Sequence, residues 1–218
     1  MKGLLFTNLY LVYRVILVYT LIGIGLTVLY LKLTGGAYVV FSAITLCLVI
    51  TIPVWEILKV EAQSGYNKYL LTLPVSRKNI IQSYYLVYFL ILVIGVILFI
   101  GILGTYSLFS EFSMDLSLFQ TIAFTILSML TLGGIIFPLI FILGEEKSDF
   151  ILLVSLLFMG LVVNSLRLSV DYLIEQIPLL KLNLNPLKHV PLIFLLIGIC
   201  IFLLSFYISL FIYRKKEF

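Results

Sequence analysis

Hydrophobic residues occur along this chain in long runs that short polar segments separate. When Asp, Glu, Lys, Arg and His are taken as breaks, six long charge-free gaps of 17 to 32 residues remain. About 20 residues of α-helix cross the roughly 30 Å of hydrocarbon in a bilayer, at about 1.5 Å per residue. Each gap therefore holds one transmembrane helix. The predicted spans are residues 15–33, 37–57, 80–102, 117–142, 150–166 and 191–212.

The same runs exclude other fold classes. Helices and strands that face water carry apolar stripes with a period of 3.6 or 2 residues, whereas these runs are apolar throughout. They also lack the alternating segments of about ten residues that form a transmembrane β-barrel. Hydrophobic residues make up 63% of the chain and the mean hydropathy is +1.25, far above soluble usage. We predict an all-α membrane protein with a single six-helix transmembrane domain over residues 1–218.

Basic residues are distributed unequally between the two sides of the predicted membrane domain. The side that holds both termini carries ten of the 14 Lys and Arg residues, and the positive-inside rule therefore places both termini in the cytoplasm. The net charge of +4 then reports topology, and we expect no nucleic-acid partner, because the aromatic residues are spread through the spans. The ten residues are Lys2, Arg14, Lys59, Lys68, Arg77, Lys78, Lys147, Arg214, Lys215 and Lys216.

The side chains needed for catalysis, metal binding and nucleotide binding are scarce. His189 is the only histidine, so neither a zinc site nor a Ser/His/Asp triad has enough residues. Cys47 and Cys200 both lie inside apolar runs, and no Gly-rich phosphate-binding loop occurs. We therefore predict no catalytic residue, no metal and no cofactor bound by this chain. In the fourth span, Gly133, Gly134 and Pro138 predict close packing or a kink.

The outer segment between the fifth and sixth spans shows an amphipathic pattern. Apolar residues recur at helical spacing from Leu166 until Pro178 interrupts them, which predicts a short helix at the outer surface. Such stripes are usually packing faces, which favours a lid on neighbouring spans; the alternative is an outer gate that contacts substrate. The candidate gate residues are Leu173, Ile174, Ile177 and Pro178.

The inner segment, residues 58–79, has a pattern of its own. Gly65 permits a break after the helix that leaves the membrane, and apolar side chains then recur at helical spacing. Pro74 disfavours helix at the preceding residue, and Ser76 is placed to cap a new helix that leads into the third span. We expect a short helix parallel to the membrane, then a turn and re-entry. Its apolar stripe consists of Tyr66, Tyr69, Leu70 and Leu73.

This inner segment also carries a resemblance to a known family. An acidic residue, Glu61, precedes Gly65 and Tyr66, and the sequence Leu-Pro-Val-Ser-Arg-Lys at residues 73–78 leads into the third span. This pattern resembles permease subunits of ABC-2 type exporters. The chain is similar above all to small bacterial six-span permeases that export antimicrobial or cytolytic amphipathic peptides, as phenol-soluble-modulin exporters do. The motif covers residues 61–78, whereas span number, topology and length agree over the whole chain.

The resemblance implies partners and site residues. Two permease subunits, either two copies or this chain and a paralogue, would form the path in the bacterial cell membrane. A pair of separate ABC ATPase subunits would bind ATP and Mg and dock from the cytoplasm. The residues in or beside the ATPase-coupling helix would be Glu61, Tyr66, Tyr69, Leu73, Pro74, Arg77 and Lys78. A secondary ATPase contact would be formed by Glu145, Glu146 and Lys147.

The function predicted from these observations is a non-enzymatic permease subunit that moves amphipathic or hydrophobic cargo, such as a peptide, out of the cell. The span centres carry no charged relay, which suits such a cargo better than an ion. Two alternatives stay open. A secondary carrier would need coupling-ion ligands or inverted repeats with interrupted spans. A non-transporting membrane sensor or immunity protein would need neither.

Overall fold

The computed structural model describes residues 2–36, 38–64, 76–109, 117–144, 147–176 and 186–215. Every regular element in these ranges is an α-helix, and all six helices are long and apolar enough to cross a membrane. The all-α class and the six spans predicted from the sequence are therefore confirmed. The helices are α1 (Lys2–Thr34), α2 (Val39–Gln63), α4 (Arg77–Phe109), α5 (Ser117–Leu143), α6 (Ser148–Gln176) and α8 (Pro186–Lys215).

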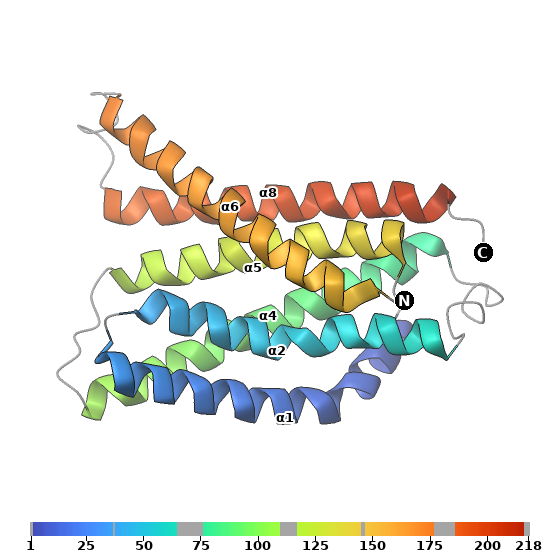
Figure 1. The fold of residues 1–218 in the computed structure, drawn as a ribbon, viewed down its shortest axis with the longest axis horizontal. Helices are drawn as coiled ribbons and strands as arrows, with labels where there is room; N and C mark the ends of the chain where they lie inside the picture. Colours follow the sequence, from blue (N-terminus) through green and yellow to red (C-terminus); the bar gives the residue numbers. More distant parts are fainter. Residues whose placement is uncertain are drawn as a thin grey trace.

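The helix α6 differs from the prediction for the outer segment. The helical spacing after Leu166 is present, but these residues continue α6 to Gln176 and do not form a separate short helix. The reason is local, since no proline occurs between Leu166 and Gln176 to remove a backbone N–H donor and interrupt the helix. Figure 1 shows α6 crossing the other helices obliquely, with its C-terminal part pointing away from the bundle. Leu173 and Ile174 lie near the end of α6, and Ile177 and Pro178 lie outside the described residues.

The bundle has a buried centre and a lipid-compatible periphery. In the span of α5, 67% of the residues are buried, against 17% in the spans of α1 and α6. The helix α5 packs on α8, α6 and α2, while α4 contacts α1, α2, α5 and α8. Large apolar side chains on α1, α6 and α8 are exposed, as in Leu21, Leu157 and Phe211. An apolar surface of this kind is stable in lipid.

Two glycines allow the close packing of α5 against α8. A Cβ atom at Gly134 would lie 3.3 Å from Cγ2 of Ile201. A Cβ atom at Gly198 would lie 3.3 Å from the Cα atom of Leu127. Small residues at such positions let the backbones of two membrane helices approach each other. The prediction of close packing at Gly134 is therefore confirmed.

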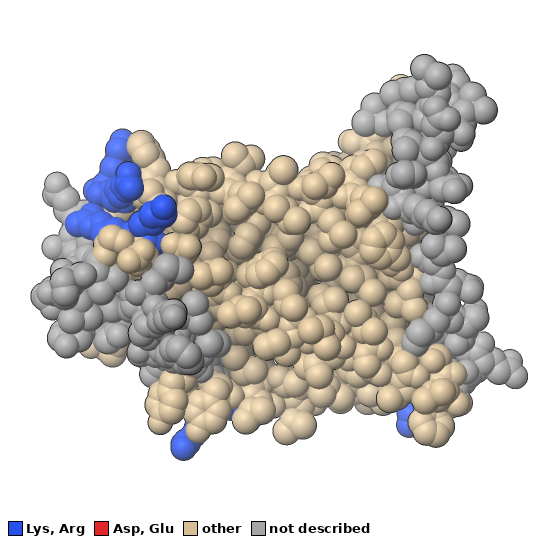
Figure 2. All heavy atoms as spheres, turned by 180° about the vertical axis from the view of Figure 1, so that it is seen from behind, with Lys and Arg blue, Asp and Glu red and all other residues tan. Residues whose placement is uncertain are grey.

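Both termini lie at the same end of the bundle. The helix α1 begins and α8 ends there, beside the end of α2 and the start of α4 (Figure 1). We call this the terminal end. Figure 2 shows one face of the molecule, on which the described residues in the middle are uncharged and most Lys and Arg side chains lie at the terminal end.

Candidate functional site

The candidate site is the terminal end of the bundle, where the predicted ATPase-coupling residues meet the spans. Glu61, Arg77 and Lys78 of the predicted coupling set are described, and so is Lys147 of the predicted secondary contact. The remaining members of these two sets lie outside the described residues. They are Tyr66, Tyr69, Leu73, Pro74, Glu145 and Glu146.

Glu61 lies inside the bundle, in the last turn of α2. Its side chain is 2% exposed, and its Oε2 atom accepts a hydrogen bond from the hydroxyl of Tyr84 on α4. Tyr84 is itself 3% exposed. A carboxylate in an apolar interior requires such donors, because burying it without them costs several kcal/mol. Glu61 therefore joins α2 to α4 where the chain leaves the membrane domain.

Arg77 is the first residue of α4 and faces the C-terminal end of α8. Ser76 caps α4, since its Oγ accepts a hydrogen bond from the backbone N–H of Asn79 at 3.3 Å, as the sequence predicted. The Nη1 atom of Arg77 donates to the carbonyls of Tyr213, at 3.2 Å, and Arg214, at 3.0 Å. Carbonyls in the last turn of a helix have no partner within that helix, and a cation there also complements the helix dipole.

Two other basic residues at this end have exposed side chains. Lys78 is adjacent to Arg77 and Lys147 lies just before α6, and both face outward. The side chain of Lys59 on α2 forms an ion pair with Asp149 in the first turn of α6, with 2.5 Å between Nζ and Oδ2. This pair brings the two predicted contact segments together, which the sequence did not predict. A pair as exposed as this one contributes little stability. It mainly shows that the end of α2 and the start of α6 lie close together.

A polar contact between α4 and α8 lies deeper in the bundle. The hydroxyl of Tyr85 is 2.7 Å from the Oγ of Ser205 and 2.8 Å from the Oγ of Ser209. Most other Ser and Thr hydroxyls in the spans, such as those of Thr131 and Ser83, bond to the carbonyl three or four residues earlier in their own helix. Ser205 and Ser209 therefore stand out as residues that bond between helices. The available sequence signal was their spacing of four residues in an otherwise apolar span, opposite a tyrosine-rich third span.

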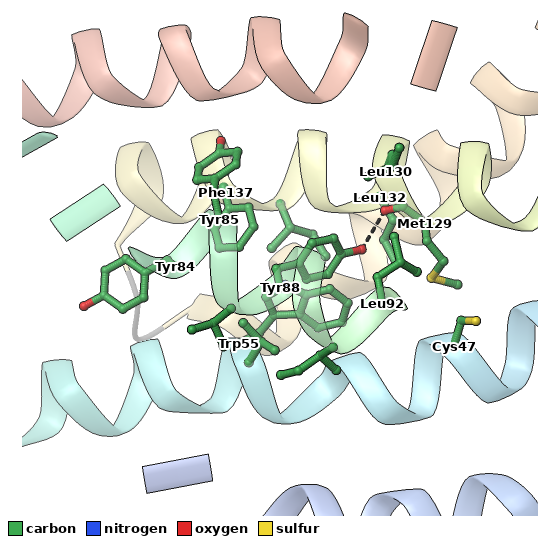
Figure 3. Close-up of a cluster of buried hydrophobic side chains, with 14 of the residues drawn as sticks. Cys47, Trp55, Tyr84, Tyr85, Tyr88, Leu92, Met129, Leu130, Leu132 and Phe137 are labelled. Carbon is green, nitrogen blue, oxygen red and sulfur yellow. Dashed lines mark hydrogen bonds between the residues drawn. The ribbon is translucent and has the colours of Figure 1, made fainter. Parts of the chain in front are cut away.

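An aromatic cluster surrounds this contact. The ring of Tyr85 stacks on Phe137 with 4.4 Å between centroids, and the ring of Tyr88 lies 5.9 Å from Trp55. Tyr88 is fully buried, and its hydroxyl donates to the carbonyl of Met129 at 2.6 Å. Figure 3 shows Tyr88 pointing from α4 toward that carbonyl on α5, with Trp55 approaching from α2. Aromatic and polar contacts together connect α2, α4, α5 and α8 in the bundle interior, further from the chain termini than the contacts of the terminal end.

Within the described ranges, no group of three or more His, Cys, Asp or Glu side chains is placed to hold a metal ion. The polar contacts described at this end are ion pairs and hydrogen bonds that connect helices, and Lys78 and Lys147 beside them have exposed side chains.

Comparison with known proteins identifies the family. The model of a family described as ABC-2 family transporter protein matches residues 3–214, nearly the whole chain. Searches of curated proteins and of solved structures found no match. The match includes all six spans and the segment with the motif at residues 61–78. The chain therefore belongs to the ABC-2 family of transporter proteins.

Proposed function

We propose that this chain is the membrane-spanning permease subunit of an ATP-driven exporter in the bacterial cytoplasmic membrane. It has no nucleotide site of its own and works with a pair of ABC ATPase subunits, which bind ATP and Mg. A second permease copy or a paralogue completes the path. The observation that carries this proposal is the family match over residues 3–214.

The geometry of the terminal end supports docking of an ATPase there. Lys78 and Lys147 expose basic side chains at this end, and the Lys59–Asp149 pair shows that the end of α2, where the coupling segment begins, lies next to the start of α6. Exposed charges of one sign steer a complementary surface toward its site. The ATPase would therefore contact the coupling segment and the start of α6 at the same time.

The cargo we propose is amphipathic or hydrophobic, and an amphipathic peptide fits best. No charged side chain lies in the middle of any described span. A path for an ion would need such groups or unwound backbone to replace the hydration shell. The sequence resemblance to peptide-exporting permeases points in the same direction and would make resistance to antimicrobial peptides one outcome of the export.

The experiment is a pull-down of the tagged chain from its native membrane in mild detergent, followed by an ATPase assay on the eluate. We expect a stoichiometric partner with a Walker A sequence and ATP turnover that vanadate inhibits. Charge reversal at Lys78 and Lys147 together should lower recovery of the partner about tenfold or more, because rim charges govern steering and register. The matched control is Lys32→Glu, which reverses an exposed charge at the opposite end of the bundle and should not change recovery.

Two outcomes would contradict the proposal. If the chain is recovered without any ATPase under conditions that preserve other membrane complexes, a secondary carrier or a sensor becomes the better explanation. If an ATPase is recovered equally well with the charge-reversed variant, the partner docks elsewhere and the terminal end is not the contact.

A further inference from the structure

We propose that Arg77 is a positioning residue, which joins the coupling segment to α8, and that it is not a docking contact for the ATPase. This inference rests on the proposed function and names the route by which movement at the docking surface enters the spans. It also separates the roles of two adjacent basic residues, Arg77 and Lys78, which the sequence motif does not distinguish.

The side chain of Arg77 is directed toward α8. It is partly buried and donates to two carbonyls in the last turn of α8, whereas the side chain of Lys78 is exposed. A hydrogen bond from a charged donor is about twice as strong as a neutral one. A partner that bound Arg77 would first have to break its hydrogen bonds to the end of α8. A partner that bound Lys78 would not have to break them.

The end of α8 that accepts the hydrogen bonds of Arg77 is firmly held. Tyr213, whose carbonyl accepts one of the two bonds, is 3% exposed. Its ring packs edge-on against Phe141 of α5, with 5.5 Å between centroids. The end of α8 is therefore anchored in the bundle, and Arg77 is attached to a part of the molecule that moves only with its neighbours.

The helices α4 and α8 are joined at two levels. Arg77 forms the outermost joint and Tyr85, bonded to Ser205 and Ser209, forms the next. Eight residues separate Arg77 from Tyr85, which is roughly 12 Å along a helix. Two joints at this separation prevent one helix from pivoting or sliding on the other. A displacement of the coupling segment at Arg77 would therefore move α4 and α8 as a pair.

The other end of the coupling segment is attached to the same pair. Glu61, at the end of α2, accepts a hydrogen bond from Tyr84 of α4. Both ends of the segment are thus held by inward-facing polar contacts, and the exposed side chain of Lys78, next to Arg77, is left for docking. Arg77 is the residue that extends this attachment to α8.

The first test uses the permease alone in lipid nanodiscs and measures hydrogen exchange in the last turn of α8. Loss of the cap in Arg77→Gln should lower protection of that turn about tenfold, in line with the usual contribution of a charged hydrogen bond. Arg77→Lys should give a smaller loss, because an ammonium lacks the planar fork of the guanidinium. The control is Lys215→Gln, which removes an exposed charge from the same turn and should change protection less than twofold. Unchanged protection in Arg77→Gln would overturn the proposal.

The second test uses the complex of this chain with its co-purified ATPase. Exchange in α8 is compared between the nucleotide-free complex and the complex trapped with ATP and vanadate. We expect trapping to change exchange in α8 of the native chain, and Arg77→Gln to reduce that change at least fivefold while recovery of the ATPase stays within twofold. If Arg77→Gln loses the ATPase as the charge-reversed Lys78 and Lys147 variant does, Arg77 is a docking contact and the proposal is wrong. A response of α8 that persists in Arg77→Gln, or is absent from the native complex, would also overturn it.

The two tests separate this inference from the proposed function. If no ATPase is recovered with the native chain, the proposed function fails, while the exchange measurement on the permease alone still decides whether Arg77 holds the end of α8. If Arg77→Gln does not yield folded protein, Arg77→Lys replaces it in both exchange measurements.

Discussion

Gly133 occupies a position in α5 where a side chain would collide with Tyr88. A Cβ atom there would lie 2.5 Å from Cε1 and 2.8 Å from Cζ of the tyrosine ring. The ring has no room to withdraw, because Tyr88 is fully buried, its hydroxyl is bonded to Met129, and Phe137 packs edge-on against it at 5.6 Å. The sequence prediction of close packing at this glycine is confirmed, and the structure adds the reason.

We therefore expect Gly133→Ala to lower the free energy of unfolding by about 1–3 kcal/mol, the usual cost of adding a methyl group to a filled core. The measurement is unfolding of the purified chain in mixed micelles of increasing denaturing detergent. The control is Gly101→Ala in α4, where a Cβ atom would meet nothing within 4 Å. Equal stability of the two variants would show that the Tyr88 ring moves freely, contrary to its burial and hydrogen bond.

At the residue scale, the sequence predicted local chemistry better than long-range partners. The cap at Ser76 follows from the proline before it and the helix after it, so it was predicted and is present. The direction of Arg77 depends on Tyr213 of α8, which lies 136 residues later in the chain, and the motif alone suits an outward contact equally well. Glu61 likewise meets Tyr84 only through the packing of α2 on α4.

At the element scale, α4 and α8 form a pair whose contact depends on Tyr85. The two hydrogen bonds of its hydroxyl lie in an apolar interior, where water cannot replace them. We expect a double-mutant cycle between Tyr85→Phe and Ser205→Ala to give a coupling free energy of about 0.5–1.5 kcal/mol, within the range for hydroxyl bonds between membrane helices. The measurement is again detergent-induced unfolding.

The control for this cycle replaces Ser205→Ala by Tyr207→Phe. Tyr207 lies on α8, as Ser205 does, but its side chain is 68% exposed. We expect no coupling between Tyr207→Phe and Tyr85→Phe. A coupling of zero between Tyr85 and Ser205 would mean that the hydroxyl of Ser209 alone satisfies Tyr85, and the triple variant with Ser209→Ala would then reveal the missing term.

Element positions were predictable from the chain because the bilayer thickness sets the length of each apolar run. All six predicted spans lie almost wholly within helices of the structure, and only their ends differ. The outer part of α6 was predicted as a separate helix because its polar face begins at Arg167, where the charge-free run ends. A change from lipid-facing to amphipathic composition does not break a helix; a proline does, and none occurs between Leu166 and Pro178.

At the scale of the whole molecule, the charges are distributed along the direction that would cross the membrane. Seven described basic side chains belong to the terminal end, namely Arg14, Lys59, Arg77, Lys78, Lys147, Arg214 and Lys215. Two belong to the opposite end, namely Lys32 and Arg167. Lys and Arg near the ends of spans are retained on the cytoplasmic side, so this asymmetry predicts that the terminal end faces the cytoplasm.

We expect single-cysteine variants to report this orientation directly. In a chain with Cys47→Ser and Cys200→Ser, Lys32→Cys should react with a membrane-impermeant maleimide in intact cells, whereas Lys215→Cys should react only after the membrane is permeabilised. Both lysines are exposed, so a difference between them reports the side of the membrane and not burial. The opposite result would have two consequences. It would show that the basic residues do not set the topology of this chain, and it would place Arg77, Lys78 and Lys147 away from the only compartment that supplies ATP. The proposed docking surface and the proposed role of Arg77 in the complex would then both be untenable, although the contact of Arg77 with α8 would remain.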